Sequence, residues 1–90
     1  MAHTLTVTGG DLVITVNGND VTFPYTLQNG DSILVRLMTR GESIKVNGEI
    51  VKGGTVVKLQ DTDIAVSQTL EEGEDRPSIY IDYTESGGGR

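Results

Sequence analysis

The segment D-V-T-F-P-Y-T-L-Q-N-G-D-S-I-L-V-R-L-M-T, residues 20–39, decides the fold, because apolar residues recur at every second position on both sides of a turn signal. They are Val21, Phe23, Tyr25 and Leu27 before the signal, and Ile33, Val35 and Leu37 after it. A period of two gives a strand one apolar and one polar face. Asn29 and Gly30 adopt φ > 0 in tight turns most readily. The segment therefore predicts a β-hairpin, with Pro24 marking an edge strand or a bulge.

The segments on either side predict further short strands. Residues 4–8 and 11–16 alternate around Gly9-Gly10, which suggests a second hairpin. A strand at 64–68 follows Asp61-Thr62-Asp63. The last strand, residues 78–84, has two faces: Ile79, Ile81 and Tyr83 share one, and Tyr80 and Asp82 share the other.

A three-stranded meander is predicted for residues 43–59, with turns at Asn47-Gly48 and Gly53-Gly54. Two-residue turns at both points fix the register. The expected opposite pairs are Ile44 with Val51, Val46 with Glu49, Val51 with Val56, and Glu49 with Lys58. Both faces of such a meander are fairly apolar, so we expect one in the core and part of the other covered by a neighbour.

These signals together predict an all-β fold. No long segment has helical periodicity, and turn signals recur about every 8–12 residues. The expected architecture is a single small antiparallel β-sandwich, or a partly open barrel, of seven to nine short strands. Residues 1–85 form the one domain, and residues 86–90, S-G-G-G-R, form a flexible glycine-rich tail.

Composition argues against several functional classes. The 90 residues include 13 acidic and 7 basic side chains, for a formal charge of -6, which disfavours nucleic acid as a partner. Aromatic residues make up 4% of the chain and Trp is absent, so it is poorly supplied for stacking sugars or bases. No apolar run reaches about 18 residues, so no membrane span is expected. The N-terminus M-A-H-T-L-T-V-T predicts no signal peptide, and hence synthesis in the cytoplasm.

Acidic residues are densest in the loop E-E-G-E-D-R-P, residues 71–77, which we expect to contribute nothing to the core. Three interpretations are open: a calcium site, a surface that docks on a basic partner, or a solvated connection. Calcium needs six to eight converging oxygens, and the spacing does not follow the EF-hand pattern. We therefore predict a solvated loop, with no metal and no cofactor.

Reactive residues do not gather into a catalytic pattern. Asp61 and Asp63 flank one residue and could do acid–base work if burial separated their pKa values, but they also suit turn capping. His3 is the only His and lies near a terminus, Cys is absent, and no G-x-S-x-G occurs. The Gly-Gly pairs lack the Lys and the helix of a phosphate loop. The sequence predicts a protein that is not an enzyme.

Most of the positive charge lies between residues 36 and 58, whereas the acids concentrate at residues 61–85. The basic residues of that part are Arg36, Arg40, Lys45, Lys52 and Lys58. Such asymmetry could support head-to-tail contacts between copies, or it could be scattered surface charge. Alternation also turns some apolar or basic residues away from the expected core. This gives a candidate interface formed by Leu34, Arg36, Met38, Ile50, Val57 and Tyr80.

As a whole, the chain is short, free of Cys, rich in Thr, Val, Gly and Asp, and built from small hairpins with a glycine tail. In this it resembles small β-sandwich structural proteins of tailed-bacteriophage virions, such as capsid decoration (auxiliary) proteins and tail or baseplate modules. The resemblance implies a homo-oligomer that binds a capsid or tail protein in many copies and resides in the virion. The alternative is an immunoglobulin-like adhesion or carbohydrate- or ligand-binding module that uses loops 17–20, 29–31 and 71–76.

Overall fold

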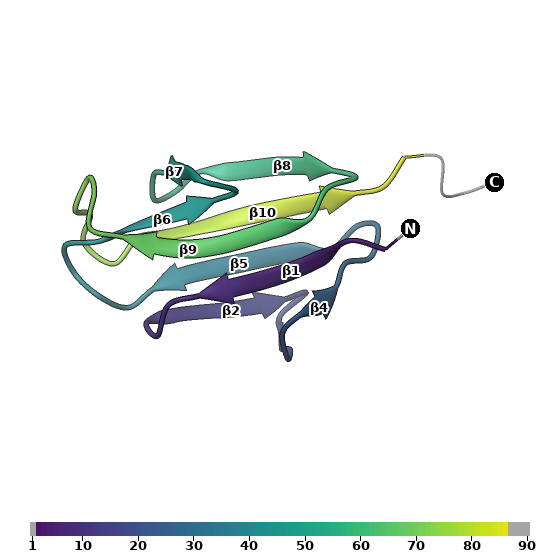
Figure 1. Ribbon diagram of the computed structural model, residues 1–90, viewed down its shortest axis with the longest axis horizontal. Helices are drawn as coiled ribbons and strands as arrows, with labels where there is room; N and C mark the ends of the chain where they lie inside the picture. Colours follow the sequence, from purple (N-terminus) through teal and green to yellow (C-terminus); the bar gives the residue numbers. More distant parts are fainter. Residues whose placement is uncertain (1, 87–90) are drawn as a thin grey trace.

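The structure is a computed structural model that describes residues 2–86 (Figure 1), and it contains ten strands in that range. In chain order they are β1 (Thr4–Thr8), β2 (Leu12–Val16), β3 (Asn19–Asp20), β4 (Tyr25–Thr26), β5 (Ser32–Leu37), β6 (Ser43–Val46), β7 (Glu49–Val51), β8 (Val56–Gln60), β9 (Ile64–Thr69) and β10 (Ser78–Thr84). The predicted all-β class is confirmed, and residues 2–86 contain no helix.

The strands form two sheets packed face to face, so the β-sandwich is confirmed and the barrel is not formed. Sheet A has the order β4-β1-β9-β6-β7, and sheet B has the order β3-β2-β5-β10-β8. Two details differ from the expectation. Ten strands occur rather than seven to nine, because β3 and β4 are separate pieces of two residues each. The sheets are also mixed, since β1 runs parallel to β9 and β8 runs parallel to β10.

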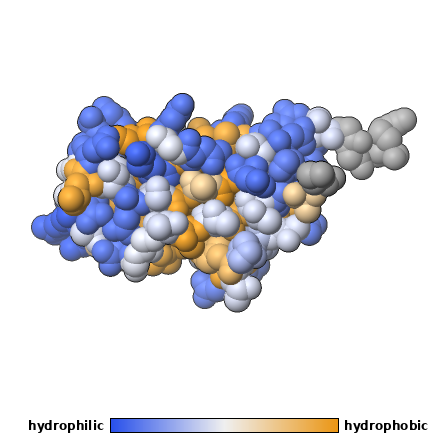
Figure 2. Space-filling model, in the orientation of Figure 1, coloured by the Kyte–Doolittle hydropathy of each residue, from blue (hydrophilic) through white to orange (hydrophobic). Residues whose placement is uncertain are grey.

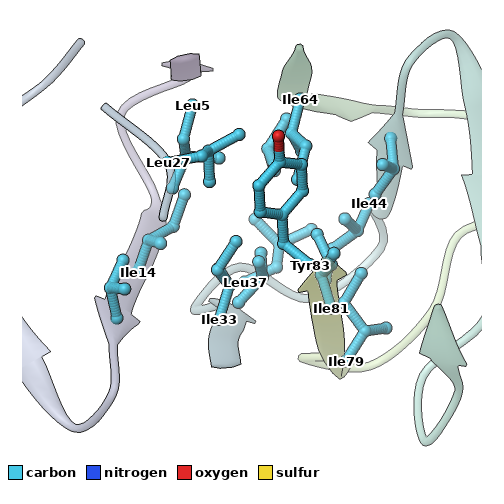
Figure 3. Close-up of a cluster of buried hydrophobic side chains, with 14 residues drawn as sticks. Leu5, Ile14, Leu27, Ile33, Leu37, Ile44, Ile64, Ile79, Ile81 and Tyr83 are labelled. Atoms are coloured by element: carbon cyan, nitrogen blue, oxygen red, sulfur yellow. The ribbon is translucent and has the colours of Figure 1, made fainter. Parts of the chain in front are cut away.

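The core lies between the two sheets and is built from the inward-facing residues of each. The predicted inner face of β10 is confirmed, since Ile79, Ile81 and Tyr83 are all buried. Figure 3 shows the Tyr83 ring in the middle of the cluster, among side chains from both sheets. Full burial of one Val, Leu or Ile contributes about 1.5–3 kcal/mol, so this layer is the main source of stability.

The predicted hairpin over residues 20–39 is wrong. β4 pairs with β1 in sheet A, whereas β5 pairs with β2 and β10 in sheet B, so the segment crosses from one sheet to the other. Asn29 and Gly30 do lie in a turn, and Gly30 has φ 90°. The buried carboxylate of Asp31 closes that turn by accepting the N–H of Gln28 at 2.8 Å. Pro24 directly precedes β4, which is an edge strand as predicted.

The predicted meander is correct in its first half only. β6 and β7 pair as expected, with Ile44 opposite Val51 and Val46 opposite Glu49. β8, however, leaves sheet A and pairs with β10, so the expected pairs of Val51 with Val56 and of Glu49 with Lys58 do not form. Residues 52–55 carry the chain across the edge of the sandwich, where Gly54 N–H donates to Ser78 O at 2.7 Å.

The Gly9-Gly10 turn also links different sheets. Strands occur on both sides of it as predicted, but β1 belongs to sheet A and β2 to sheet B, so they do not form a hairpin. Gly9 has φ 130°, and a Cβ there would overlap Gln68 Oε1. That oxygen already accepts the Asp11 N–H at 3.2 Å. The corner therefore needs glycine for both its conformation and its space.

The described part of the chain ends beside the turn that precedes β9. Ser86, which the sequence assigned to the flexible tail, donates its N–H to Asp61 Oδ1 at 3.1 Å and its hydroxyl to Asp61 Oδ2. The rest of the predicted tail, residues 87–90, lies outside the described residues.

Candidate interaction surface

The outer face of sheet B carries a row of apolar side chains across four strands. Leu34 of β5 lies opposite Tyr80 of β10, and Tyr80 lies opposite Val56 of β8. Val13 of β2 is on the same face, opposite Arg36. Directly opposite residues have Cβ atoms about 5 Å apart, and diagonal neighbours such as Val13 and Leu34 are about 7–8 Å apart, within reach of long side chains. The four apolar side chains therefore form one patch. We call Val13, Leu34, Val56 and Tyr80 the apolar stripe.

The stripe is exposed although its residues are large and apolar. Val13 is 37% exposed, Tyr80 49% and Val56 52%, while Leu34 is half-buried. Single exposed apolar residues are ordinary on any protein, but a contiguous set on one sheet face is typical of a surface that another molecule covers. A covered Val or Tyr side chain would contribute to binding through the area removed from water.

The outer face of sheet A has a different character. The register places Thr6 beside Ala65 and Thr8 beside Ser67 on this face, with Lys45 on the other side of Ser67. Sheet A is in front in Figure 1, and in the same view of Figure 2 blue and pale residues predominate over β1 and β9. Short hydroxyl-bearing side chains suit a strand face that stays in water. Sheet B therefore presents the better interaction surface of the two.

Charge around the stripe is balanced. Arg36 lies beside Val13, and Lys58 lies opposite Asp82 in the β8–β10 pair. A chain of formal charge -6 thus has, on this one face, an area where basic and acidic groups are matched. Approach of a protein partner meets less electrostatic repulsion here than at surfaces dominated by carboxylates.

The residues predicted as an interface are only partly brought together. Leu34, Arg36 and Tyr80 lie on the outer face of sheet B, and Met38 follows the end of β5 with 51% of its surface exposed. Ile50 is opposite Lys45, so it lies on the outer face of the other sheet.

The prediction that Val57 faces away from the core is wrong. It lies opposite Ile81, and its half-buried side chain packs against the core. The sequence reasoning also missed Val13 and Val56. Val56 was assigned to the face of Val51 because β8 was expected beside β7. The available signal was that Val56 and Val57 point to opposite faces of their strand. Using that signal required knowing that β8 pairs with β10.

The carboxylates of Asp61 and Asp63 are each engaged with a different part of the chain. The hydrogen bonds from Ser86 lower the pKa of Asp61. Asp63 accepts the Thr4 N–H at 2.9 Å and lies 3.3 Å from His3 Nδ1, and these contacts lower the pKa of Asp63. Both side chains are exposed and stay ionised at neutral pH, so they hold residues 3–4 and Ser86 at the turn before β9.

The acidic loop is more ordered than predicted. Glu74 Oε1 accepts the Gly53 N–H at 2.9 Å, and Asp75 forms an ion pair with Arg40 at 3.2 Å. Pro77 is buried, although none of residues 71–77 belongs to the hydrophobic core between the sheets. Among residues 2–86, no group of three or more His, Asp or Glu side chains is arranged to hold a metal ion.

The basic residues of 36–58 are spread over the molecule. Arg36 and Lys58 lie on the outer face of sheet B, Lys45 lies on that of sheet A, and Arg40 pairs with Asp75 at one end. They form no single basic patch. Head-to-tail contacts between copies stay a prediction.

A hollow of about 480 Å³ lies at the segment between β3 and β4 and is open to solvent. It is lined by Asp20, Val21, Thr22 and Tyr25. The Tyr25 hydroxyl is already used, since it donates to Asp31 Oδ2 at 3.0 Å, and Asn17 Nδ2 donates to the other oxygen at 2.9 Å. Burial and this carboxylate raise the pKa of Tyr25. The polar groups at the hollow thus act to hold loops 17–20 and 28–31 together.

No protein family model, curated protein or solved structure matches this chain. Residues 2–86 also contain no helix with the length and hydropathy needed to cross a membrane.

Proposed function

We propose that this protein is a non-enzymatic structural module that docks the outer face of sheet B on a protein scaffold and acts in several copies. The observation that carries the proposal is the apolar stripe, an exposed row of apolar side chains on one face while the opposite face is polar. A small domain gains from such docking, because a partner that binds only the folded state stabilises it by mass action. The resemblance to virion structural proteins suggests a capsid or tail protein as the scaffold.

The charged groups support a structural role as well. Four carboxylates accept hydrogen bonds that hold loops or terminal segments in place, namely those of Asp31, Asp61, Asp63 and Glu74. Carboxylates used in this way rigidify the frame on which the stripe is displayed. A rigid interaction face costs less conformational entropy on binding than a mobile one.

The test is binding of purified protein to purified virion shells or tails that carry no bound copy, measured by co-sedimentation. The double substitution Val13→Ser and Leu34→Ser removes apolar surface from the face and should weaken binding about tenfold or more. The matched control, Ala65→Ser with Ile50→Ser on the outer face of sheet A, should bind as the unmodified protein does. Equal binding by both variants, or no binding by the unmodified protein, would refute the proposal.

A further inference from the structure

The open edge of sheet B is the longest unpaired strand edge in the described part of the molecule. The two sheets end in β3, β4, β7 and β8, and the first three contain only two or three residues each. β8 contains five residues and pairs only with β10. Long open edges are templates for another strand, and most proteins shorten or cover them.

The hydrogen bonds around β8 show which of its backbone groups are free. Tyr80 N–H donates to Thr55 O at 3.1 Å, and Asp61 N–H donates to Thr84 O at 3.1 Å. Because backbone groups alternate in direction along a strand, the odd-numbered residues Val57 and Leu59 between these points face β10 as well. The N–H and C=O groups of Val56, Lys58 and Gln60 therefore point away from the sheet.

We propose that β8 pairs antiparallel with β8 of a second copy, so that sheet B continues from one copy into the other. This pairing deepens the proposed function, since it names the contact between copies. It rests on the proposed function for the claim that several copies act together. The alternation on β8 leaves even-numbered residues of one copy opposite even-numbered residues of the other. Each hydrogen-bonded pair then exchanges two N–H···O=C bonds.

Charge and hydrogen bonding select one register. Lys58 opposite Lys58 sets like charges side by side, which is unfavourable. Val56 opposite Val56 would extend the joint to Gly54, whose N–H is already bonded to Ser78 O. Lys58 opposite Gln60 leaves Val56 outside the joint. Val56 opposite Lys58 of the second copy avoids the like-charge pair and keeps Val56 in the pairing. It places Gln60 opposite Gly54, but its two Val56–Lys58 pairs alone give roughly four hydrogen bonds, whereas Val56 opposite Val56 gives about two without Gly54.

The surroundings of the edge favour a second copy as the occupant. Two molecules of formal charge -6 repel each other, but the only charged residue on β8 is Lys58, which lies beside Asp82. The competing edges β3 and β7 carry Asp20 and Glu49 instead. In the selected register, the methylene groups of Lys58 cover Val56 of the other copy. The apolar stripe, which reaches the edge at Val56, then extends across the joint.

Cysteine cross-linking tests the register, because the chain contains no Cys. Val56→Cys and Lys58→Cys variants are prepared separately, oxidised alone and as a mixture, and read by intact mass. The proposal expects disulfide-linked heterodimers in the mixture and little cross-linking of either variant alone. Efficient cross-linking of Lys58→Cys or Val56→Cys with itself would overturn the register, and no cross-linking in any sample would overturn the pairing.

A second variant separates the edge from the face. Lys58→Pro removes an outward N–H and leaves the bonds of β8 to β10 intact, as proline on an edge strand allows. Light scattering after size exclusion should show a dimer for the unmodified protein and a dissociation constant raised about tenfold or more for Lys58→Pro. The Val13→Ser, Leu34→Ser variant should still dimerise. A dimer without scaffold binding refutes the proposed function only; scaffold binding by a strict monomer refutes the edge pairing only.

Discussion

The substitution Tyr83→Phe should destabilise the protein at neutral pH and stabilise it at strongly alkaline pH. The Tyr83 ring is fully buried, and its hydroxyl donates to Glu85 Oε2 at 3.1 Å. Burial raises the pKa of Tyr83 to about 12, and the neighbouring Glu85 carboxylate adds to the shift. The folded protein therefore holds this proton more tightly than the unfolded chain, whose tyrosine pKa is 10.0.

The sign and size follow from linkage. Between the two pKa values the unfolded chain binds fewer protons than the native protein, so the free energy of unfolding falls as pH rises. The contribution of the raised Tyr83 pKa to the free energy of unfolding is fully present below pH 10 and is lost as pH rises through 12. Two pKa units correspond to about 2.7 kcal/mol, of which about 1.4 kcal/mol is lost by pH 11. At neutral pH Tyr83→Phe loses one hydrogen bond, which costs about 1 kcal/mol.

The two proteins should thus be equally stable near pH 11, and Tyr83→Phe should be the more stable above it. Urea unfolding at pH 7, 9, 10, 11 and 12 measures the difference, and every other titrating group is common to both proteins. A tyrosinate absorbance titration of both proteins gives the pKa of Tyr83 by subtraction. A difference that stays constant across this range would refute the argument, because it would show that Tyr83 titrates as it does in the unfolded chain.

Four further substitutions test the frame, each by urea unfolding at neutral pH. Asp31→Ala leaves the Tyr25 hydroxyl and the Gln28 N–H without their shared acceptor and should cost about 3 kcal/mol, whereas a loss below about 1 kcal/mol would contradict its fastening role. Val57→Ser should cost about 1–2 kcal/mol and Val56→Ser less than about 0.5 kcal/mol, and the reverse order would mean that β8 is turned over. Gly9→Ala should cost about 1 kcal/mol or more, because alanine disfavours φ 130° and its Cβ meets Gln68; a neutral effect would contradict that corner geometry.

The sequence predicted which residues face the core far better than which strands are neighbours. Alternation identified Ile79, Ile81 and Tyr83 correctly, since burial on one face is a property of a strand by itself. The partner of a strand is a property of the whole chain. In a sandwich, two alternating segments joined by a turn can pair in one sheet or face each other across the core, and both arrangements have the same period.

The turn dipeptides show the same limit. Asn47-Gly48 joins the paired strands β6 and β7, whereas Asn29-Gly30 joins segments of different sheets. Both glycines have positive φ, at 84° and 90°, so the local conformation was predictable in each case. The two turns differ in their contacts outside the dipeptide. The Asp31 carboxylate binds Tyr25 and Asn17, and these contacts hold the segment that crosses from sheet A to sheet B in place. Nothing within a four-residue turn reveals such partners.

The surface residues were predictable where their position depends only on alternation within one strand. Leu34 and Tyr80 are outward by their own alternation, and the antiparallel pairing of β5 with β10 then makes them neighbours. Val56 joins them only because β8 is parallel to β10, a pairing that needs the crossover through β9 and the loop that follows it. Parallel pairs always require such long connections, and single-sequence patterns do not encode them.

The edges of the two sheets link the proposed pairing to stability. Three of the four edge strands are so short that they offer few free backbone groups, which is how monomeric sheet proteins avoid edge-to-edge association. β8 is longer, and on it the apolar stripe reaches the edge. Lys58 offers partial protection, since it penalises the one register in which it would face itself, but it leaves the neighbouring register open. An edge protected against aggregation in general would carry further charge or a proline, and β8, V-V-K-L-Q, has neither. Its sequence therefore suits an edge that is covered by one specific partner strand.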